Sequence, residues 1–231
     1  LELIAADANF QKKKIIVLAK EGWHNGVIGI VASRITEMFY RPCILLSLSN
    51  GVGKGSGRSI PGFNLFDALN ECDDLLTNFG GHAVAAGLGI NENNIEAFTK
   101  KINAYADGIM TEQDMIPSVK IDCILHENNI SLAAARAIAK LEPYGMGNER
   151  PVFVIKDVEV IQISAVGADG KHLRMKIARN GVTAACIGFG LGEYVNEIQP
   201  GGRVHLAFRF DINTYQGNES LQLQLADIKM V

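Results

Sequence analysis

The spacing of hydrophobic residues changes near residue 150, and this change limits the folds open to the chain. Between residues 14 and 109, short apolar runs alternate with segments in which apolar residues recur every three or four positions. Such alternation is typical of an α/β domain. Beyond residue 151 the apolar residues recur every second position, as in strands that bury one face. The chain therefore contains two regions that are built differently.

The first region begins with a β-α-β pattern. The apolar runs IIVLA and CILLSLS flank a segment, 27–38, in which apolar residues recur at helical spacing. Two strands joined by such a crossover helix are usually parallel. A glycine-rich segment and a second helical pattern follow, and Asn91 is expected to cap a further helix that runs to about Ala106. We predict an α/β domain over residues 1–110, with helices on a mixed or parallel sheet.

The second region has the element order of an OB-fold barrel. Three strands, a short helical stretch (LGEYVNEI) and two more strands make up this order, and an OB-fold commonly binds oligonucleotides on the face of its strands 2 and 3. We predict an all-β OB-fold domain over residues 151–231. Residues 111–150, with the expected strand VKIDCIL, a helix capped by Ser131 and the turn-rich EPYGMGNERP, are predicted to be a connector. The five expected barrel strands are 152–163, 171–179, 182–189, 203–211 and 221–228.

Composition narrows the classes of function. Of 231 residues, 48% are hydrophobic, but no apolar run approaches the roughly 20 residues of a membrane span, so no membrane partner is expected. Four widely spaced cysteines without a C-x-x-C pair argue against a zinc site or a disulfide framework and favour a cytoplasmic location. The start, LELIAADANF, has neither an initiator methionine nor a signal pattern, so we interpret the chain as a piece of a longer protein. With a net charge of −3, any attraction for nucleic acid must come from local faces.

The run GVGKGSGRS is the first candidate binding segment, with a glycine at every second position over 51–57. Its spacing fits neither a Walker A loop nor a dinucleotide fingerprint. In an extended chain, the glycines leave one side open to another backbone or a sugar-phosphate strand, while Lys54, Ser56 and Arg58 lie on the other. The arginine fork and the hydroxyls, including that of Ser59, could close around a phosphate. A flexible hairpin tip with solvated charges fits the same spacing, so both interpretations stay open.

The segment GGHAVAAG, at 80–87, is the second candidate. Two glycines permit a tight turn, from which the backbone of Gly81 and the imidazole of His82 can point at an anion. A lone histidine is more often a structural hydrogen bonder, and spacing alone leaves that alternative open. His24, which precedes the first helix, could cap that helix or hold Trp23 in place, and we interpret its role as structural.

The barrel region carries a third candidate set. His172, Arg174 and Lys176 share one side of an expected strand and could contact a nucleic-acid backbone, although solvated charges would look the same. Tyr215 is the candidate for base stacking. No D-x-D, DHH or H-E-x-x-H motif is present, and no cluster of carboxylates and histidines could hold two metal ions. No catalytic residue and no metal ligand is therefore assigned.

Several segments resemble one known family when they are taken together. They are GWHNGVIGIVASRI, the arginine-proline before CILLSL, GKGSGRSIPGFNLFDAL, FGGHAVAAGL and LEPYGMGNERPVF. GGH followed by AAG is similar to the DHH-associated domain of the DHH phosphoesterase superfamily. The GSGRS run, the LEPYGMGN segment and a following OB-fold narrow the resemblance to the C-terminal half of the RecJ family of bacterial single-strand-specific exonucleases.

The resemblance implies a division of labour in a longer protein. An N-terminal DHH domain would bind two Mn²⁺ or Mg²⁺ ions and hydrolyse DNA from the 5′ end, in DNA repair and recombination. Ser56 and Arg58 would bind the phosphate at the 5′ end, and His82 would contact a phosphate beside the metals. The implied partners are single-stranded DNA and the DHH domain of the same chain, with a single-strand-binding protein and a helicase as further candidates. The present residues alone are then expected to be inactive.

Two other functions stay open. A stand-alone single-stranded nucleic-acid-binding module or scaffold without catalysis would need the same surfaces. Sequence upstream of Leu1 would separate this alternative from the exonuclease. A phosphodiesterase of the same superfamily that acts on short oligonucleotides or cyclic dinucleotides is disfavoured by the appended barrel.

Overall fold

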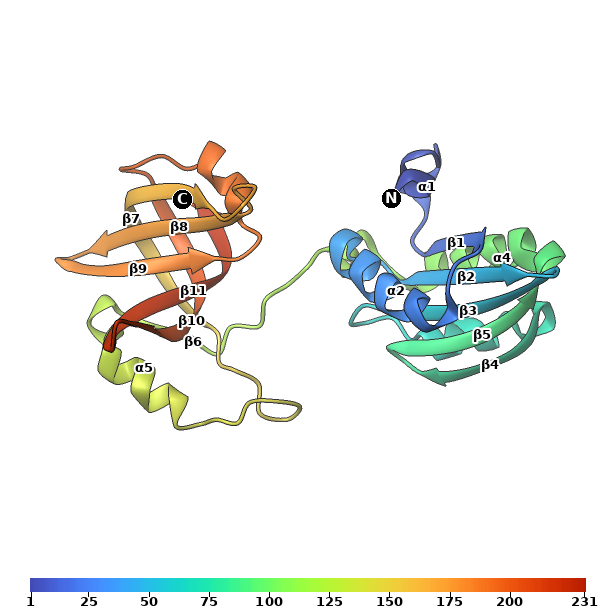
Figure 1. Ribbon diagram of the computed structural model, residues 1–231, viewed down its shortest axis with the longest axis horizontal. Helices are drawn as coiled ribbons and strands as arrows, with labels where there is room; N and C mark the ends of the chain where they lie inside the picture. Colours follow the sequence, from blue (N-terminus) through green and yellow to red (C-terminus); the bar gives the residue numbers. More distant parts are fainter. The chain divides into compact units, whose positions relative to one another are not determined.

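The protein forms two compact units, Leu1–Pro117 and Ser118–Val231, in a computed structural model that describes all residues, 1–231 (Figure 1). The segment 111–150 is therefore divided between the units and is not a separate connector. The physical reason is burial, because Ile130 and Ala135 lie in the hydrophobic core of the second unit. None of the helices combines the length and apolar character that crossing a membrane requires.

The first unit is built on a five-stranded mixed sheet in the order β1-β2-β3-β5-β4. As predicted, β1 and β2 are parallel, while the other neighbouring pairs are antiparallel. Both glycine-rich candidate segments are strands of this sheet. The strands are β1 (Ile16–Glu21), β2 (Cys43–Ser49), β3 (Val52–Arg58), β4 (Leu76–His82) and β5 (Ala85–Asn91).

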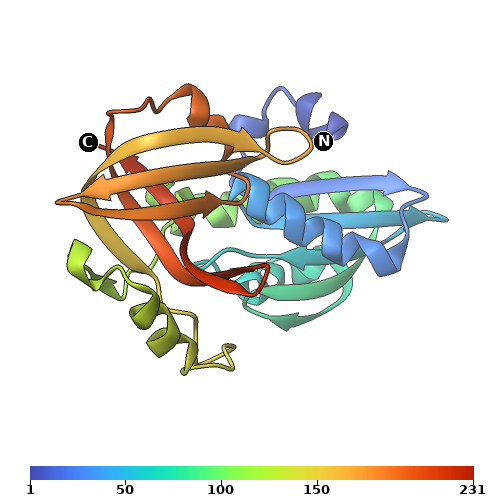
Figure 2. The same cartoon turned by 60° about the vertical axis from the view of Figure 1, so that its left-hand side comes forward.

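Helices cover both faces of this sheet (Figures 1 and 2). On one face, α2 (Asn25–Phe39) buries Ile28 and Ile35 against Leu45 of β2. On the other, α3 (Leu65–Asn70) and α4 (Ile95–Ile109) bury their apolar sides against a larger core. The remaining short elements are α1 (Glu2–Ala5), η1 (Phe10–Lys12), η2 (Asp73–Leu75), η3 (Glu92–Asn94) and η4 (Glu112–Met115).

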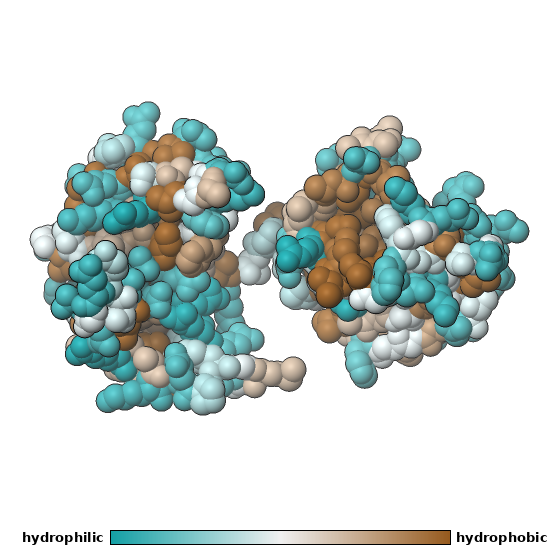
Figure 3. Space-filling view, viewed as in Figure 1, coloured by the Kyte–Doolittle hydropathy of each residue, from teal (hydrophilic) through white to brown (hydrophobic).

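Helix α2 is also apolar on the side that faces away from the sheet (Figure 3). Four of its apolar side chains are between 39% and 63% exposed. They recur at helical spacing, so they form one stripe. These residues are Val27, Ile30, Val31 and Met38.

Two helix starts confirm the capping predictions. His24 Nδ1 accepts a hydrogen bond from the backbone N–H of Gly26 at 3.1 Å, at the start of α2. Ser131 Oγ accepts one from the N–H of Ala134 at 3.2 Å, at the start of α5 (Leu132–Ala139). Each cap satisfies a donor that has no partner within its helix.

The cap predicted at Asn91 is wrong. Asn91 is the last residue of β5 and makes no side-chain cap bond. The chain then forms the 3₁₀ turn η3, and α4 begins only at Ile95. The helix starts later because residues 92–94, which the pattern assigned to its first turn, form η3, and the N–H of Glu92 donates to the carbonyl of Gly51 at 2.9 Å.

The second unit contains a closed five-stranded barrel. Strand β7 (Phe153–Val166) pairs with β8 along its C-terminal half and with β10 along its N-terminal half, which closes the barrel. The strand order β7-β8-β9-β11-β10 is that of an OB-fold. The predicted strand VKIDCIL forms only the two-residue β6 (Cys123–Ile124), parallel to β7. The other elements are η5 (Glu127–Asn129), β8 (His172–Arg179), β9 (Val182–Gly188), η6 (Gly192–Asn196), β10 (Arg203–Tyr215) and β11 (Asn218–Met230).

The hairpin of β10 and β11 is longer than the sequence predicts. The polar sequence INTYQGNES indicates a loop, but the strands stay paired up to a two-residue turn at Gln216 and Gly217. Both turn residues have positive φ, 50° and 77°, as primed hairpin turns require. Tyr215 therefore lies in a strand beside this tip, and its side chain is 69% exposed.

Asn103 of α4 satisfies the backbone just before β1. Its Oδ1 accepts a hydrogen bond from the N–H of Ile15 at 3.0 Å, and its Nδ2 donates to the carbonyl of Ile15 at 3.1 Å. Ile15 is fully buried, with 0% exposure. The amide thus supplies the partners that a neighbouring strand would otherwise give.

We predict that Asn103→Ala lowers the free energy of unfolding by about 1–3 kcal/mol, because it leaves two buried backbone groups unpaired. The matched control in the same helix is Lys100→Ala, which removes only an exposed ion pair with Glu96 and should leave stability unchanged. Urea unfolding followed by circular dichroism measures both. Equal midpoints for the two variants would contradict the role of Asn103.

Candidate functional site

Strand register brings the predicted residues of the first unit onto one face of the sheet. Arg58 of β3 pairs with Ala85 of β5, which pairs with His82 of β4. Adjacent strands lie about 4.8 Å apart, so the Cα atoms of Arg58 and His82 are roughly 10 Å apart. Every second residue of a strand lies on the same face of the sheet, so the rows next to this one hold the other candidates of β3, Ser56 and Lys54. The three rows across β3, β5 and β4 are Arg58–Ala85–His82, Ser56–Gly87–Gly80 and Lys54–Gly89–Asn78.

We call Lys54, Ser56, Arg58, Asn78 and His82 the polar face. In the middle row of this face, β5 and β4 carry only glycines, Gly87 and Gly80, so the backbone there is bare. A Cβ added at Gly80 would meet no atom within 4 Å, and one added at Gly87 would meet only a backbone oxygen at 3.8 Å. An extended ligand backbone can therefore approach the sheet closely at this point.

Helix α2 contacts the polar face at Gly29. A Cβ at Gly29 would lie 3.0 Å from Nη2 of Arg58 and 3.1 Å from Oγ of Ser56. Arg58 Nη1 donates to Ser56 Oγ at 3.1 Å and to the carbonyl of Gly57 at 2.7 Å. These bonds fix the guanidinium, while its Nε and Nη2 form no hydrogen bond in the structure. The fork is thus held in place with donors available to an anion.

The opposite side of β3 is not open. A Cβ at Gly55 would lie 2.7 Å from a methyl carbon of both Leu46 and Leu88, and one at Gly57 would lie 2.7 Å from a methyl carbon of Leu65. The prediction that this side accepts a sugar-phosphate strand is therefore wrong, because leucines of the core fill it. The alternative of a flexible hairpin tip is also wrong, since β3 is paired along both edges.

The tight turn of the GGH segment lies later than predicted. Gly80 and Gly81 are within β4, and the chain turns at 83–84. The two turn carbonyls accept hydrogen bonds from the N–H groups of Leu65 and Ser59, both at 2.9 Å. The hydroxyl of Ser59 donates to the carbonyl of Phe63 at 2.8 Å. Both donors of Ser59 thus hold the loop before α3, and its phosphate contact stays a prediction.

The basic residues of the barrel lie over a shallow hollow. Arg174 and Lys176 point outward from β8, and they are exposed while Met175 between them is buried. They pair with Ser164 and Gln162 of β7. These four residues line a hollow of about 460 Å³. Its position on the first three barrel strands is the face with which OB-folds commonly bind oligonucleotides.

His172 is tied into the structure more firmly than its neighbours. Its Nδ1 accepts a hydrogen bond from the N–H of Gly190 at 3.1 Å. Its ring packs edge-on against Phe189, with centroids 5.3 Å apart. The imidazole therefore orients the aromatic ring, while its predicted contact with nucleic acid stays a prediction.

Two residues that the sequence reasoning missed belong with these surfaces. Phe189 is 59% exposed, and an exposed ring beside basic residues can stack on a base. The signal was an aromatic residue directly after the third barrel strand. Asn78 lies on the polar face, where a Cβ at Gly89 would come within 3.0 Å of its Oδ1. Its signal was weaker, because only the pairing of β4 with β5 reveals its side.

Comparison with known proteins agrees with both units. Residues 12–108 match the family described as the DHHA1 domain, and residues 121–227 match the RecJ OB domain. The chain belongs to the RecJ family. We therefore call its first unit the DHHA1 domain and its second unit the OB domain.

The relatives share one printed name, single-stranded-DNA-specific exonuclease RecJ. The protein of Bacillus subtilis is 36% identical over 214 residues, which cover 92% of this chain and 27% of the relative. The protein of Escherichia coli is 32% identical over 213 residues, with 89% and 36% covered. The crystal structure of RecJ in complex with Mn²⁺ from Thermus thermophilus superimposes with a TM-score of 0.81 at 30% identity, covering 99% of this chain and 32% of that one. This chain thus spans 27% to 36% of the lengths of these relatives.

The DHHA1 and OB domains contain no cluster of side chains that could ligate a divalent ion. RecJ of T. thermophilus was crystallised in complexes with Mg²⁺ and with Mn²⁺. In this chain no three His, Cys, Asp or Glu side chains lie together so that they could hold a metal. The thiols are protonated where they are buried, because burial raises the pKa of Cys43 and of Cys186 to about 12. The candidate residues on the two surfaces are arginine, lysine and histidine side chains, whose N–H groups suit phosphate oxygens.

We predict that Gly81→Ala destabilises the DHHA1 domain by about 1–3 kcal/mol or more. Gly81 has a φ of +144°, and a Cβ there would lie 2.4 Å from the carbonyl oxygen of Ala85. The matched control is the adjacent Gly80→Ala, which meets no atom within 4 Å and should change stability by less than about 0.5 kcal/mol. Thermal and urea unfolding report the difference. Equal stability of the two variants would contradict the inference that the close approach of β5 requires a glycine at position 81.

Proposed function

We propose that this chain is the substrate-binding part of a single-stranded-DNA-specific exonuclease. The DHHA1 domain and the OB domain hold the DNA strand, and a further domain of the whole protein hydrolyses it. The observation that carries the proposal is the single row of Arg58 and His82 beside the bare backbone of Gly80 and Gly87. The activity printed in the names of the RecJ relatives supports it.

The polar face suits phosphates of a single strand. Its charged groups are the cations Lys54 and Arg58, and neither forms an ion pair in the structure. A planar guanidinium binds two phosphate oxygens at once, which a point charge cannot do. The absence of side chains at Gly80 and Gly87 lets a sugar-phosphate backbone lie against the strands. We assign the 5′-terminal phosphate to Ser56 and Arg58, and a phosphate beside the scissile bond to His82.

In this proposal, metal binding and hydrolysis belong to the whole protein and not to the two domains of this chain. A DHH domain of the same chain would hold Mn²⁺ or Mg²⁺, and the Mg²⁺ and Mn²⁺ complexes of T. thermophilus RecJ support that use of metal. The metal supplies Lewis-acid chemistry there, while the present residues bind and orient the strand. A cytoplasmic role in DNA repair and recombination, with a single-strand-binding protein and a helicase as partners, completes the proposal. The 231 residues alone are expected to bind DNA without hydrolysing it.

We predict that Arg58→Lys in the whole protein lowers kcat/KM on 5′-phosphorylated DNA by roughly ten- to a hundredfold. The change keeps the charge and removes the fork, so DNA with a 5′-hydroxyl should be affected much less. His82→Ala should slow cleavage of both substrates to a similar degree, because its contact does not depend on the end group. Mononucleotide release from the two labelled substrates measures this.

Lys100→Ala, on the exposed side of α4, is the control and should match the wild type on both substrates. Equal kcat/KM for wild type and Arg58→Lys on phosphorylated DNA would overturn the assignment of the terminal phosphate. A whole protein that binds single strands and hydrolyses none would instead support a stand-alone binding module.

We predict a second effect in the OB domain of the 231-residue chain. Arg174→Glu with Lys176→Glu should weaken binding of single-stranded DNA and reduce the salt slope of the binding constant by about 1.4, since each lost phosphate contact removes about 0.7. The control reverses two other exposed charges, Lys140 and Lys229, and should keep the slope. Fluorescence anisotropy at several salt concentrations measures both. Tighter binding of duplex than of single strand would contradict the role of this face.

A further inference from the structure

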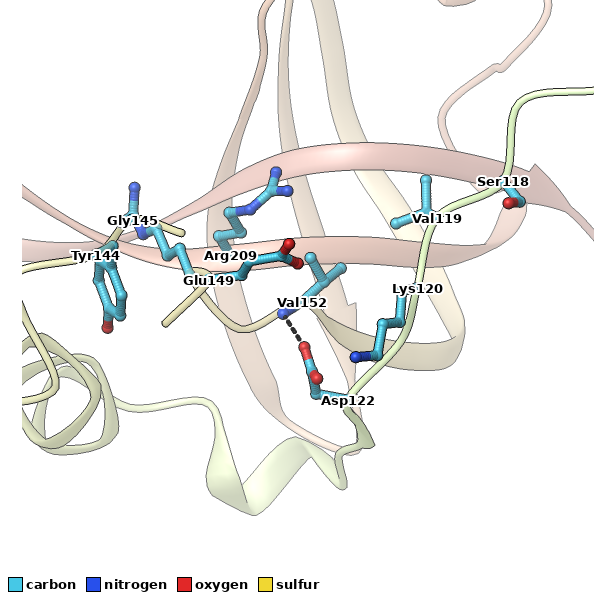
Figure 4. A pocket seen from close by; sticks show the side chains of 10 residues that line it. Ser118, Val119, Lys120, Asp122, Tyr144, Gly145, Glu149, Val152 and Arg209 are labelled. Atoms are coloured by element: carbon cyan, nitrogen blue, oxygen red, sulfur yellow. Dashed lines mark hydrogen bonds between the residues drawn. The ribbon is translucent and has the colours of Figure 1, made fainter. Parts of the chain in front are cut away.

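A second polar pocket lies on the outer surface of the OB domain (Figure 4). Its volume is about 680 Å³, and its walls come from residues just before β6, from the EPYGMGNERP segment and from β10. We call it the β10 pocket. The side chains that matter for binding are Lys120, Tyr144, Arg150 and Arg209, together with the carboxylates of Asp122 and Glu149.

Strand register joins the β10 pocket to the basic residues of β8. Arg174 pairs with Ile187 of β9, Ile187 pairs with Gln224 of β11, and Gln224 pairs with Arg209 of β10. All four point out of the barrel, because the residues beside them in each strand are buried in its core. Three strand spacings of about 4.8 Å separate Arg174 from Arg209, or roughly 14 Å along the surface. The buried neighbours are Leu173, Met175, Cys186, Gly188, Leu223, Leu225, Phe208 and Phe210.

The pocket is organised before any ligand arrives. Arg150 donates to the carbonyl of Phe210 and, at 3.3 Å, to Oε1 of Gln224, so it ties the EPYGMGNERP segment to β10 and β11. Tyr144 donates its hydroxyl to the carbonyl of Ile138 at 2.6 Å, which fixes its half-buried ring. A ring already held in place loses little freedom when a base stacks on it.

The free charges of the pocket suit a single phosphate. Lys120 and Arg209 form no hydrogen bond or ion pair in the structure, whereas Asp122 accepts the N–H of Val152 at 2.9 Å. Three cationic side chains face two carboxylates, and Nη2 of Arg150 is also paired with Oδ1 of Asp211 at 3.6 Å, so little or no excess positive charge remains. Such a balance favours one phosphate with its nucleotide over a run of phosphates.

We propose that the β10 pocket is a second subsite for single-stranded DNA and holds one nucleotide of a strand that also contacts Arg174. Arg209 and Lys120 bind the phosphate, and the base lies against the ring of Tyr144. The strand then passes over Ile187 and Gln224, beyond the first three barrel strands. This inference rests on the proposed function.

The test uses the 231-residue chain and an oligo-dT strand of about 12 nucleotides. Arg209→Gln with Lys120→Gln should lower affinity roughly tenfold or more and reduce the salt slope by about 0.7, the value for one phosphate contact. Tyr144→Leu keeps an apolar side chain and should lower affinity without a change in slope. The matched control, Lys140→Gln with Lys229→Gln, removes the same charge and should leave both quantities unchanged.

The outcomes separate this inference from the proposed function. If the β10-pocket variants behave like the control while Arg174→Glu with Lys176→Glu weakens binding, the subsite is overturned and the proposed function stands. If no variant alters binding, or the chain does not bind the strand, both are overturned. Should Arg209→Gln fail to fold, Lys120→Gln alone tests the same subsite, because Lys120 lies outside every strand. Its expected loss of affinity and its expected fall in slope are both smaller than those of the double variant.

Discussion

The structure of the DHHA1 domain depends on a strand that has no side chains on one of its sides. Because Gly55 and Gly57 lack a Cβ, the methyl groups of Leu46, Leu88 and Leu65 can pack directly on the backbone of β3. This close packing holds β3 in the centre of the sheet between β2 and β5. It also fixes which side every other residue of the strand takes. The polar residues of β3 face away from the core because the glycines must face it.

Much of the fold follows from hydrophobic spacing alone. The alternation around Leu173 and Met175 predicts a barrel strand to within a residue, and the parallel pair β1–β2 follows from the crossover helix. Spacing fails where apolar side chains are scarce. The strand that ends at His82 consists largely of glycine and polar residues, and the tip of the β10–β11 hairpin around Tyr215 is polar on both faces. Backbone pairing forms these strands, and pairing leaves no mark on local hydropathy.

The candidate site divides in the same way. The alternation of side chains along a strand places Lys54, Ser56 and Arg58 on one side, and this needs no knowledge of the fold. The same argument cannot predict that Arg58 and His82 lie close together, because their proximity depends on β5 lying between β3 and β4. A resemblance to a family suggested that the two residues act together, and the register of the sheet supplies the geometry. Asn78 depends on the pairing of β4 with β5, Phe189 on its position directly after β9, and the β10 pocket on segments that are distant in sequence.

A bare glycine surface has a consequence for the DNA-binding role proposed for this chain. The polar face lets a strand come close, but Gly80 and Gly87 give it no side chain to contact, so the domain offers few groups per nucleotide. With a net charge of −3, the chain as a whole does not attract a polyanion either. Affinity must then come from aromatic and basic groups elsewhere, and the OB domain has them in Phe189, Arg174 and the β10 pocket. In the proposed function the two domains would hold one strand, and two linked sites bind far more tightly together than either alone, so each contact at the polar face can be weak.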